Sequence, residues 1–554
     1  MEEKAKRGME ESGGMRKWVV LAVVGSLLFS ATLLFANLGK RDLWNPDEPR
    51  YSEIAREMVL DRTLLVPHLN GQVYTQKPPF FFWLVAGSYK IFHRIDEFTA
   101  RFPIALSAVL GILLIFLIGR RLFDPLTGFF SALVLATTSE YFWLANRVNL
   151  DTVMTLFILA SVYMVVRAME EERHRTLYFR LAFFFSGVAT ITKGPLGIIV
   201  PFLTLIVYLL VEGEFQVLKK VPWLSGVGIF VLVLVAGLAP TCLAGGKAYT
   251  HELIFRQTVT RYVHGINHKK GFWFYFYGFP ETLLPWTFFL PGAVWFALRR
   301  RSEKHFWKPF MFVVVWIVAN ILFLSFSGSK RQLYALSLVP AGGLVVGVYL
   351  SGLWRGEVEW NRWYQVPVYA LGIVSVLGGL LAPFVPYLIH SRFPDLKIPL
   401  FPFLLLGGMG IGTGVILGVL TYKKRFKYGV VLIFLAFYAV FFLGTRWILP
   451  MFDTVKSPRA LGEKVQALMD EGYDLRTYGW LQHAGILFYT RRTHIPVVPA
   501  DPNEMAFLQR SPKAALLLRK RQVKEAASMV PVPLEVMWEG RVGHRRFLIL
   551  RPSR

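Results

Sequence analysis

The chain has 554 residues, of which 54% are hydrophobic and 15% aromatic, a composition too apolar for a soluble globular protein. The formal net charge is +26, but much of it lies in short loops between apolar runs. This pattern indicates a polytopic membrane protein and argues against nucleic acid as a partner.

Apolar runs long enough to cross a bilayer recur along the whole chain. We predict about thirteen spans, near residues 18–37, 102–119, 125–141, 150–167, 178–192, 194–212, 222–243, 281–298, 308–326, 332–352, 364–388, 400–421 and 428–450. The first run lacks a convincing cleavage site and is predicted to be an uncleaved anchor. A cytoplasmic N-terminus places the basic loops in the cytoplasm too. These loops contain Arg120-Arg121, Lys219-Lys220, Arg299-Arg300-Arg301 and residues 423–427.

Two large segments then fall on the outer face, a loop from Leu38 to about Arg101 and a tail from about Met451. The tail alternates helix-like and strand-like pieces, which predicts a small soluble α/β domain. The helix-like pieces are 456–471, 501–510 and 520–528, and the strand-like pieces are 474–479, 494–498, 514–518, 534–538 and 545–550. We therefore expect an all-α transmembrane domain with outer catalytic loops at 1–450 and an outer α/β domain at 451–554.

The first outer loop contains two apolar pieces that are too short to span a membrane. Pro49 to Leu60 has apolar residues at helical spacing and charges on its other side, which predicts an amphipathic helix lying flat in the membrane interface. Pro79 to Phe92 is rich in Phe and Trp. We expect both juxtamembrane helices to form a rim where a lipid enters.

Asp47 stands at the start of the first amphipathic segment, in Asn45-Pro46-Asp47-Glu48-Pro49-Arg50-Tyr51. Asp is a favoured helix cap and Pro49 sits just inside the start, so capping is one interpretation. A carboxylate in this place also suits catalysis on a substrate dissolved in lipid. Arg50 lies about one helical turn away and is expected to orient Asp47, to bind a phosphate, or to be ordinary surface charge.

Further charged residues follow in outer loops. Lys77 precedes a double proline that presents it from a rigid backbone, and a snorkelling lysine is the alternative. Asp151 begins a span close to Arg147, so it is either a cap or functional, since charged residues at membrane level tend to be functional. Lys193 occupies the turn Thr192-Lys193-Gly194-Pro195.

Two histidines, His264 and His268, are spaced to share a helical face and are weak candidates for a metal site. The segment Ser329 to Tyr334 adds Lys330, Arg331 and the phenol of Tyr334. Together with the cations above, these residues place positive charge on the outer face, which the positive-inside rule does not explain. An anionic headgroup is their natural partner, and a polyprenyl phosphate is the obvious candidate.

These residues and their order resemble the bacterial lipid A aminoarabinose transferases and their relatives in the protein O-mannosyltransferase superfamily. These are integral-membrane glycosyltransferases of the GT-C type. The resemblance covers most of the chain, through Asp47 to Tyr51, Lys77-Pro78-Pro79, Asp151, Thr192 to Pro195, His268 with Phe272 to Tyr275, and Ser329 to Pro340.

The resemblance implies an undecaprenyl-phosphate-linked sugar donor and inverting transfer on the outer side of the bacterial inner membrane. It implies that Asp47 is the principal catalytic carboxylate and Asp151 a supporting one. The residues expected to bind the donor phosphate are Arg50, Lys77, Arg147, Lys193, His268, Lys330 and Tyr334. Gln76 stands where aminoarabinose transferases commonly have a glutamate associated with a metal, so a divalent metal stays an open alternative and no cofactor is firmly expected.

The leading hypothesis is therefore transfer of a sugar to lipid A or another cell-envelope acceptor by a monomeric enzyme. A protein O-glycosyltransferase is the second alternative. A lipid or solute transporter is less favoured, because the charges gather at one face instead of mid-membrane. A non-catalytic envelope scaffold is a third class.

Overall fold

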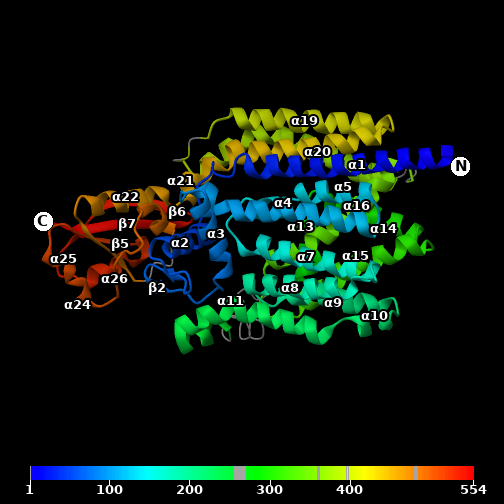
Figure 1. Cartoon of the computed structure of the whole chain (residues 1–554). Coiled ribbons are helices and arrows are strands. Elements are labelled where there is room, and N and C mark those ends of the chain that lie inside the picture. The colour runs from blue at the N-terminus through cyan, green and yellow to red at the C-terminus, as the bar shows by residue number, and fades with distance from the viewer. Residues whose placement is uncertain are drawn as a thin grey trace.

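The computed structural model describes residues 2–254, 270–357, 362–394, 396, 398–479 and 485–553, with side chains from Lys17 onward. A long bundle of roughly parallel and antiparallel helices carries a smaller α/β unit at one end, and the N-terminus lies at the opposite end (Figure 1). Within the described residues, 9 helical segments are long and apolar enough to cross a membrane. The expected multi-span architecture is thus present.

The helices of the bundle are α1 (Glu2–Phe35), α4 (Glu97–Leu122), α5 (Pro125–Ala136), α6 (Ser139–Ala145), α7 (Leu150–Glu170), α8 (Arg175–Lys193), α9 (Leu196–Val211), α10 (Phe215–Lys220), α11 (Trp223–His251), α13 (Phe274–Thr282), α14 (Leu290–Arg299), α15 (Lys304–Ser325), α16 (Val339–Arg355), α17 (Arg362–Leu381), α18 (Val385–Arg392), α19 (Phe401–Tyr422) and α20 (Phe426–Leu443). Short 3₁₀ and π segments connect or extend them, namely η2 (Trp286–Phe289), η3 (Gln332–Leu338), η4 (Ala382–Phe384), η5 (Gly444–Ile448) and η6 (Pro450–Phe452).

Four of the predicted spans coincide with helices outside these 9 segments. The helices α5 and α9 have only 12 and 16 residues, shorter than the roughly 20 that a bilayer requires. Helix α8 begins with Arg175 and contains Arg180, which lowers its hydropathy. The predicted span at 281–298 is divided between η2 and α14.

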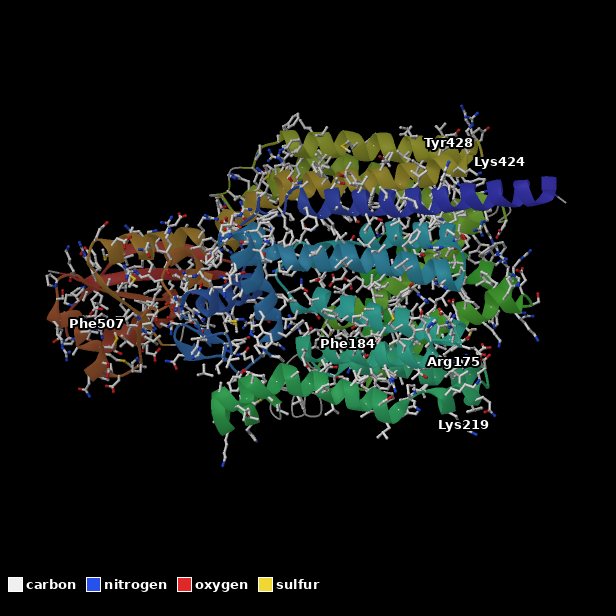
Figure 2. The ribbon with its side chains drawn as sticks, in the orientation of Figure 1. Arg175, Phe184, Lys219, Lys424, Tyr428 and Phe507 are labelled. Atoms are coloured by element: carbon white, nitrogen blue, oxygen red, sulfur yellow. The ribbon has the colours of Figure 1, made fainter. Side chains whose placement is uncertain are left out.

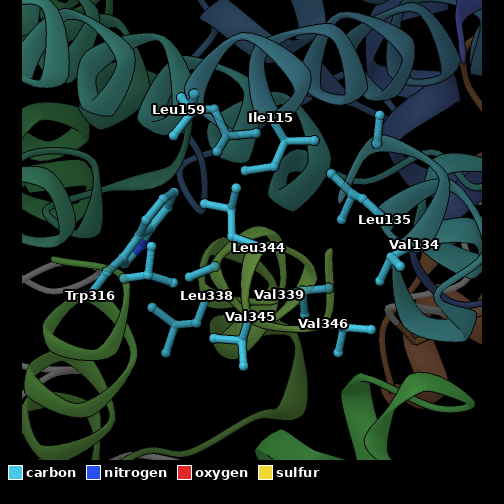
Figure 3. Packing of buried hydrophobic residues seen from close by; sticks show 14 of the residues in the cluster. Ile115, Val134, Leu135, Leu159, Trp316, Leu338, Val339, Leu344, Val345 and Val346 are labelled. Carbon is cyan, nitrogen blue, oxygen red and sulfur yellow. The ribbon is translucent and has the colours of Figure 1, made fainter. Parts of the chain in front are cut away.

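Helix α16 forms the centre of the bundle. Its residues from Val339 to Leu353 are all buried, and Leu344 lies among side chains of α4, α7 and α15, including Ile115 and Trp316 (Figure 3). Gly347 allows a close approach to α5, because a Cβ atom there would lie 2.1 Å from the Ser131 hydroxyl oxygen. A helix that is apolar on every side is expected at such a position.

The first outer loop folds as α2 (Asp47–Leu60), the short hairpin β1 (His68–Leu69) and β2 (Gln72–Val73), and α3 (Phe80–Ile91). The predicted amphipathic helix is present as α2, but its charged side is not free to face water or headgroups. One face of α2 packs on α3, and the other packs on α23 (Gly485–Thr490) of the tail. Its charged side chains Glu53, Arg56 and Glu57 are therefore buried by protein.

The tail contains a five-stranded mixed sheet in the order β4-β3-β5-β7-β6. Its strands are β3 (Asp474–Tyr478), β4 (Val497–Val498), β5 (Ala514–Arg519), β6 (Leu534–Val542) and β7 (Arg545–Pro552). Strand β3 pairs in parallel with β4 and β5, whereas β7 is antiparallel to β5 and β6. The helical elements around it are α21 (Asp453–Lys456), α22 (Arg459–Asp470), α23, α24 (Pro502–Met505), α25 (Phe507–Arg510), η7 (Lys520–Gln522) and α26 (Val523–Ser528). The predicted small α/β unit is present.

Candidate active site

Asp47 and Arg50 form an ion pair in the first turn of α2, with the carboxylate and guanidinium 2.5 Å apart. The capping interpretation of Asp47 is wrong, because Pro46 occupies the cap position and makes no side-chain cap bond. The side chains of Asp47 and Arg50 are 29% and 21% exposed, so a substrate can reach both. Among the described residues, the buried Nε–H of Arg50 has no hydrogen-bond partner. A buried donor without a partner calls for an explanation, and a bound anion would satisfy it.

Glu48, the next residue, has a different environment that sequence analysis did not recognise. Its side chain is fully buried and pairs with Arg41 at 2.7 Å, Arg101 at 3.0 Å and Arg147 at 3.8 Å. Burial on its own raises the pKa of Glu48, but Arg101, Arg41 and Arg147 outweigh it and hold this pKa well below its usual range. Glu48 thus joins the start of α2 to α4 and to the turn before α7. Its position suits a structural role, while Asp47 is the accessible carboxylate.

Asp151 and Lys193 form a second, more buried ion pair. Their side chains are only 6% and 14% exposed. The capping interpretation of Asp151 is wrong, because the side chain of Asn149 accepts the capping hydrogen bond from the Thr152 amide at 3.0 Å. The Lys193 ammonium lies 4.9 Å from the ring centroid of Tyr334, in η3. Three predicted site residues are therefore brought together from α7, α8 and η3.

The remaining predicted cations occupy varied positions. Arg147 contacts Glu48 and also stacks on Trp143 at 4.9 Å. Lys330 is buried and donates hydrogen bonds to the carbonyl oxygens of Ser327 and Lys270, at 2.7 and 3.1 Å. Lys77 is half-buried just before α3.

The predicted metal site at the two histidines cannot be compared with the structure. His264 and His268 lie outside the described residues. Within the described ranges, no group of three or more His, Cys, Asp or Glu side chains is arranged to hold a metal ion. Gln76 is exposed and accepts a long hydrogen bond, 3.4 Å, from the Tyr74 hydroxyl.

Glu140, in α6, is a further carboxylate that sequence analysis missed. Burial raises its pKa, and the negative charges of Asp151 and Glu281 raise it further, against the effect of Arg147. It therefore lies within electrostatic reach of Asp151. In the sequence Glu140 falls inside the predicted span at 125–141, whereas the structure places it in the separate short helix α6.

The tail holds the segment just before Asp47 in place. The Trp44 indole donates to Asp453 of α21 at 2.6 Å, and the Leu43 amide donates to the Tyr489 hydroxyl of α23 at 2.9 Å. Arg459 of α22 pairs with Asp42 at 2.8 Å. Three tail elements thus contact residues within one short stretch of the outer loop. Sequence alone does not reveal these contacts, because each pair is separated by most of the chain.

Residues 76–238 match the family model described as dolichyl-phosphate-mannose-protein mannosyltransferase. An undecaprenyl phosphate-alpha-4-amino-4-deoxy-L-arabinose arabinosyl transferase of Proteus mirabilis is 29% identical over 59% of this chain. The alignment spans 59% of that relative's own length. An uncharacterized protein of Aquifex aeolicus is 26% identical over 87% of this chain and 88% of its own.

The crystal structure of ArnT from Cupriavidus metallidurans bound to undecaprenyl phosphate has the same fold. It superposes with a TM-score of 0.74 and 22% identity, covering 96% of this chain and 98% of that one. The resemblance predicted from the sequence is confirmed by these findings. The chain is a multi-pass membrane protein that resembles the GT-C membrane glycosyltransferases in sequence and in fold.

Proposed function

We propose that the chain is an inverting glycosyltransferase that takes a sugar from an undecaprenyl-phosphate-linked donor. Its acceptor is lipid A or another cell-envelope molecule on the periplasmic face. The names of the arabinosyl transferase relatives support the donor class. The observation that carries the proposal is the accessible Asp47–Arg50 pair, with a buried guanidinium N–H that lacks a partner among the described residues.

The chemistry of such a transfer suits this pair. The leaving group is a phosphate monoester whose negative charge grows in the transition state, so a preorganised cation lowers the barrier. In the proposal, Arg50 donates its unused Nε–H to this phosphate. Asp47 acts as general base when the acceptor is a hydroxyl. When the acceptor is an ionised phosphate, Asp47 instead orients it or stabilises an oxocarbenium-like sugar.

The second ion pair supports the first in this proposal. Asp151 fixes Lys193 on the ring of Tyr334, so the ammonium is held in one position for the donor phosphate. Arg147 contributes from beside Glu48. We assign Lys77, His268 and Lys330 to the same phosphate site from the family resemblance alone.

The proposal also includes the orientation of the chain in the membrane. An odd number of spans, about thirteen with the short helices counted, places residues 1–450 in the bacterial inner membrane and 451–554 in the periplasm. Figure 2 supports this orientation, because the labelled basic residues Arg175, Lys219 and Lys424 lie at the end of the bundle away from the tail residue Phe507. We propose that the enzyme acts as a monomer.

A protein acceptor is the second candidate. The family model that matches residues 76–238 is described by transfer of mannose to protein. Gln76, which replaces the glutamate common in aminoarabinose transferases, also weakens the case for an amino sugar. The reaction type is therefore better supported than the identity of either substrate.

The first experiment is mass spectrometry of lipid A from a host that lacks its own transferase. The host is compared with and without the gene, and with the Asp47→Asn and Asp61→Asn variants. Asp61 lies at the exposed far end of the same helix and serves as the matched control. A glycosylated lipid A in wild type and Asp61→Asn, absent in Asp47→Asn, supports the proposal. Unmodified lipid A together with glycosylated envelope protein supports the second candidate.

A further inference from the structure

One end of the tail sheet is strongly basic. Residues 519–525 and 539–546 together contain seven Lys or Arg residues and two Glu residues. We call six of these cations the basic sheet end. They lie at the ends of β5 and β6, at the start of β7 and in η7, and they are Arg519, Lys520, Arg521, Arg541, Arg545 and Arg546. Strand pairing brings these segments together, because Arg519 lies opposite Phe547, and Val542 lies opposite Arg545.

This arrangement is unfavourable for the fold on its own. Arg541 and Arg546 are direct cross-strand partners, and like charges in that relation are destabilising. The Glu539 carboxylate offsets part of this charge and lies 3.0 Å from Lys520 and 3.7 Å from Arg546. Burial lowers the pKa of Arg519, and the charge of Arg545 lowers it further. Repulsion of this kind is relieved when a multiply charged anion binds.

The basic sheet end lies at the membrane-facing end of the tail. The Gly543 amide, in the β6–β7 turn, donates to the Val455 carbonyl oxygen of α21 at 2.6 Å. The Arg541 guanidinium lies 4.9 Å from the ring centroid of Phe393. Phe393 directly follows the segment Arg362–Arg392, which is long and apolar enough to span a membrane. In Figure 1 the end of β6 lies beside α21.

The same end is also connected to the candidate active site. Helix α21, which accepts the hydrogen bond from Gly543, carries Asp453. Asp453 in turn accepts hydrogen bonds from the Trp44 indole at 2.6 Å and the Asp42 amide at 3.0 Å. A headgroup held by the basic sheet end is therefore next to the loop that leads to Asp47.

We infer that the basic sheet end docks the phosphorylated headgroup of the lipid acceptor, in the outward-facing leaflet. The inference rests on the proposed function for its choice of an acceptor, and on charge complementarity for its choice of phosphate. Arginine forks bind phosphate through paired charge-assisted hydrogen bonds. Arg541 and Arg546, both exposed and side by side, are the principal contacts.

The test is hydrogen exchange of the full chain in phosphatidylcholine nanodiscs, followed at the peptide covering residues 541–547. The nanodiscs contain bisphosphorylated lipid A, dephosphorylated lipid A or phosphatidylglycerol. The amount of phosphatidylglycerol is chosen to match the negative charge of the bisphosphorylated lipid A. We expect slower exchange with bisphosphorylated lipid A only. Equal exchange in all three discs, or equal protection by phosphatidylglycerol, overturns the inference.

A kinetic experiment adds a matched pair of variants. Arg541→Gln/Arg546→Gln is expected to raise the KM for lipid A by about tenfold through loss of charge-assisted hydrogen bonds, with kcat and the donor KM unchanged. Arg510→Gln/Lys513→Gln, at the opposite end of β5, removes the same charge and is expected to change none of these values. Equal effects of both pairs overturn the inference. Absence of transfer by the wild type contradicts the proposed function instead, and the exchange experiment still decides the docking site.

Discussion

Asp151 and Lys193 offer a way to separate a structural role from a role in transfer. Lys193→Met leaves a buried carboxylate unpaired, which is expected to destabilise the protein by about 3–5 kcal/mol. In the double variant Asp151→Asn/Lys193→Met no charge is left unpaired, so most of this stability returns. We expect the double variant to fold and to remain inactive, because the cation that faces Tyr334 is lost.

Thermal unfolding in detergent and a transfer assay measure the two roles separately. Asp470→Asn, which removes the exposed pair between Asp470 and Arg492, is the control and is expected to change neither. If the double variant regains full transfer, the pair serves stability alone and its assignment to the donor site is wrong.

Glu57 predicts a pH dependence of stability. Burial, with the charge of Glu53 next, raises the pKa of Glu57 to about 8, although its carboxylate accepts hydrogen bonds from the amides of Asn70 and Gly71. A carboxyl group whose pKa is higher in the folded state contributes stability below its unfolded pKa, and this contribution is lost as the pH rises through the folded pKa. The wild type is therefore expected to lose stability between roughly pH 4.5 and pH 8.

The matched variants are Glu57→Gln and Glu504→Gln. Glutamine at residue 57 cannot ionise, so the Tm difference between Glu57→Gln and wild type is expected to become more positive as the pH rises from 5 to 9. Glu504 is exposed on α24, and its substitution is expected to leave the pH profile unchanged. A constant difference for Glu57→Gln across this range contradicts the assignment.

At the scale of single residues, the sequence predicted contacts between residues close in the chain and missed contacts between distant ones. Charges near the membrane surface directed attention to Asp47, Arg50, Asp151 and Lys193, and the structure pairs them two by two. Glu48 was overlooked because its partners Arg41, Arg101 and Arg147 are spread over three segments. Local spacing predicts neighbours along a helix but not partners across the fold.

At the scale of elements, α23 packs on the start of α2 through a glycine. A Cβ atom on Gly485 would lie 2.6 Å from the Asn45 side-chain oxygen, 2.8 Å from Pro49 and 2.9 Å from Pro458. Gly485→Ala is therefore expected to push the tail away from the loop that carries Asp47. The expected cost is about 1–3 kcal/mol, as for other overpacked sites, together with reduced transfer.

Gly87→Ala is the matched control, because nothing lies within 4 Å of the added atom on α3. Unfolding temperature and transfer rate are measured for both variants in detergent. We expect Gly87→Ala to behave as wild type or slightly better, since alanine favours a helix. Wild-type behaviour of Gly485→Ala would mean that the contact with α23 does not position Asp47.

Secondary structure in the tail was predicted well, because strand patterns there are strong. Strand β5 is a continuous buried run from Ala514 to Leu518, as expected for a strand covered on both faces. Helix α2 was placed in the membrane interface because its polar face pointed to water or headgroups. Contacts with the tail instead cover that face, where Arg56 donates to the carbonyl oxygens of Leu487 and Arg492, at 3.3 and 2.5 Å. No local pattern reveals a partner that arrives from the other end of the chain.

At the scale of the whole molecule, charge and contacts give the bundle two different ends. One end carries the basic loops and the other carries α2, α3 and the tail (Figures 1 and 2). The positive-inside rule then predicts that the loop at 423–427 is cytoplasmic and the tail is periplasmic. These two parts are separated by the segment Phe426–Lys456, which is long and apolar enough for a single span.

Cysteine labelling tests this orientation with little background, because Cys242 is the one cysteine in the sequence. In a Cys242→Ser chain, Lys424→Cys and Glu504→Cys each add one exposed thiol, on either side of that segment. A membrane-impermeant maleimide applied to cells with a permeabilised outer membrane is expected to label Glu504→Cys only, and Lys424→Cys only after lysis. The reverse pattern would mean that the protein has the opposite orientation in the membrane. Labelling of both in intact cells would place the tail and the basic loop on the same side, and Asp47 would lose its assigned access to a periplasmic acceptor.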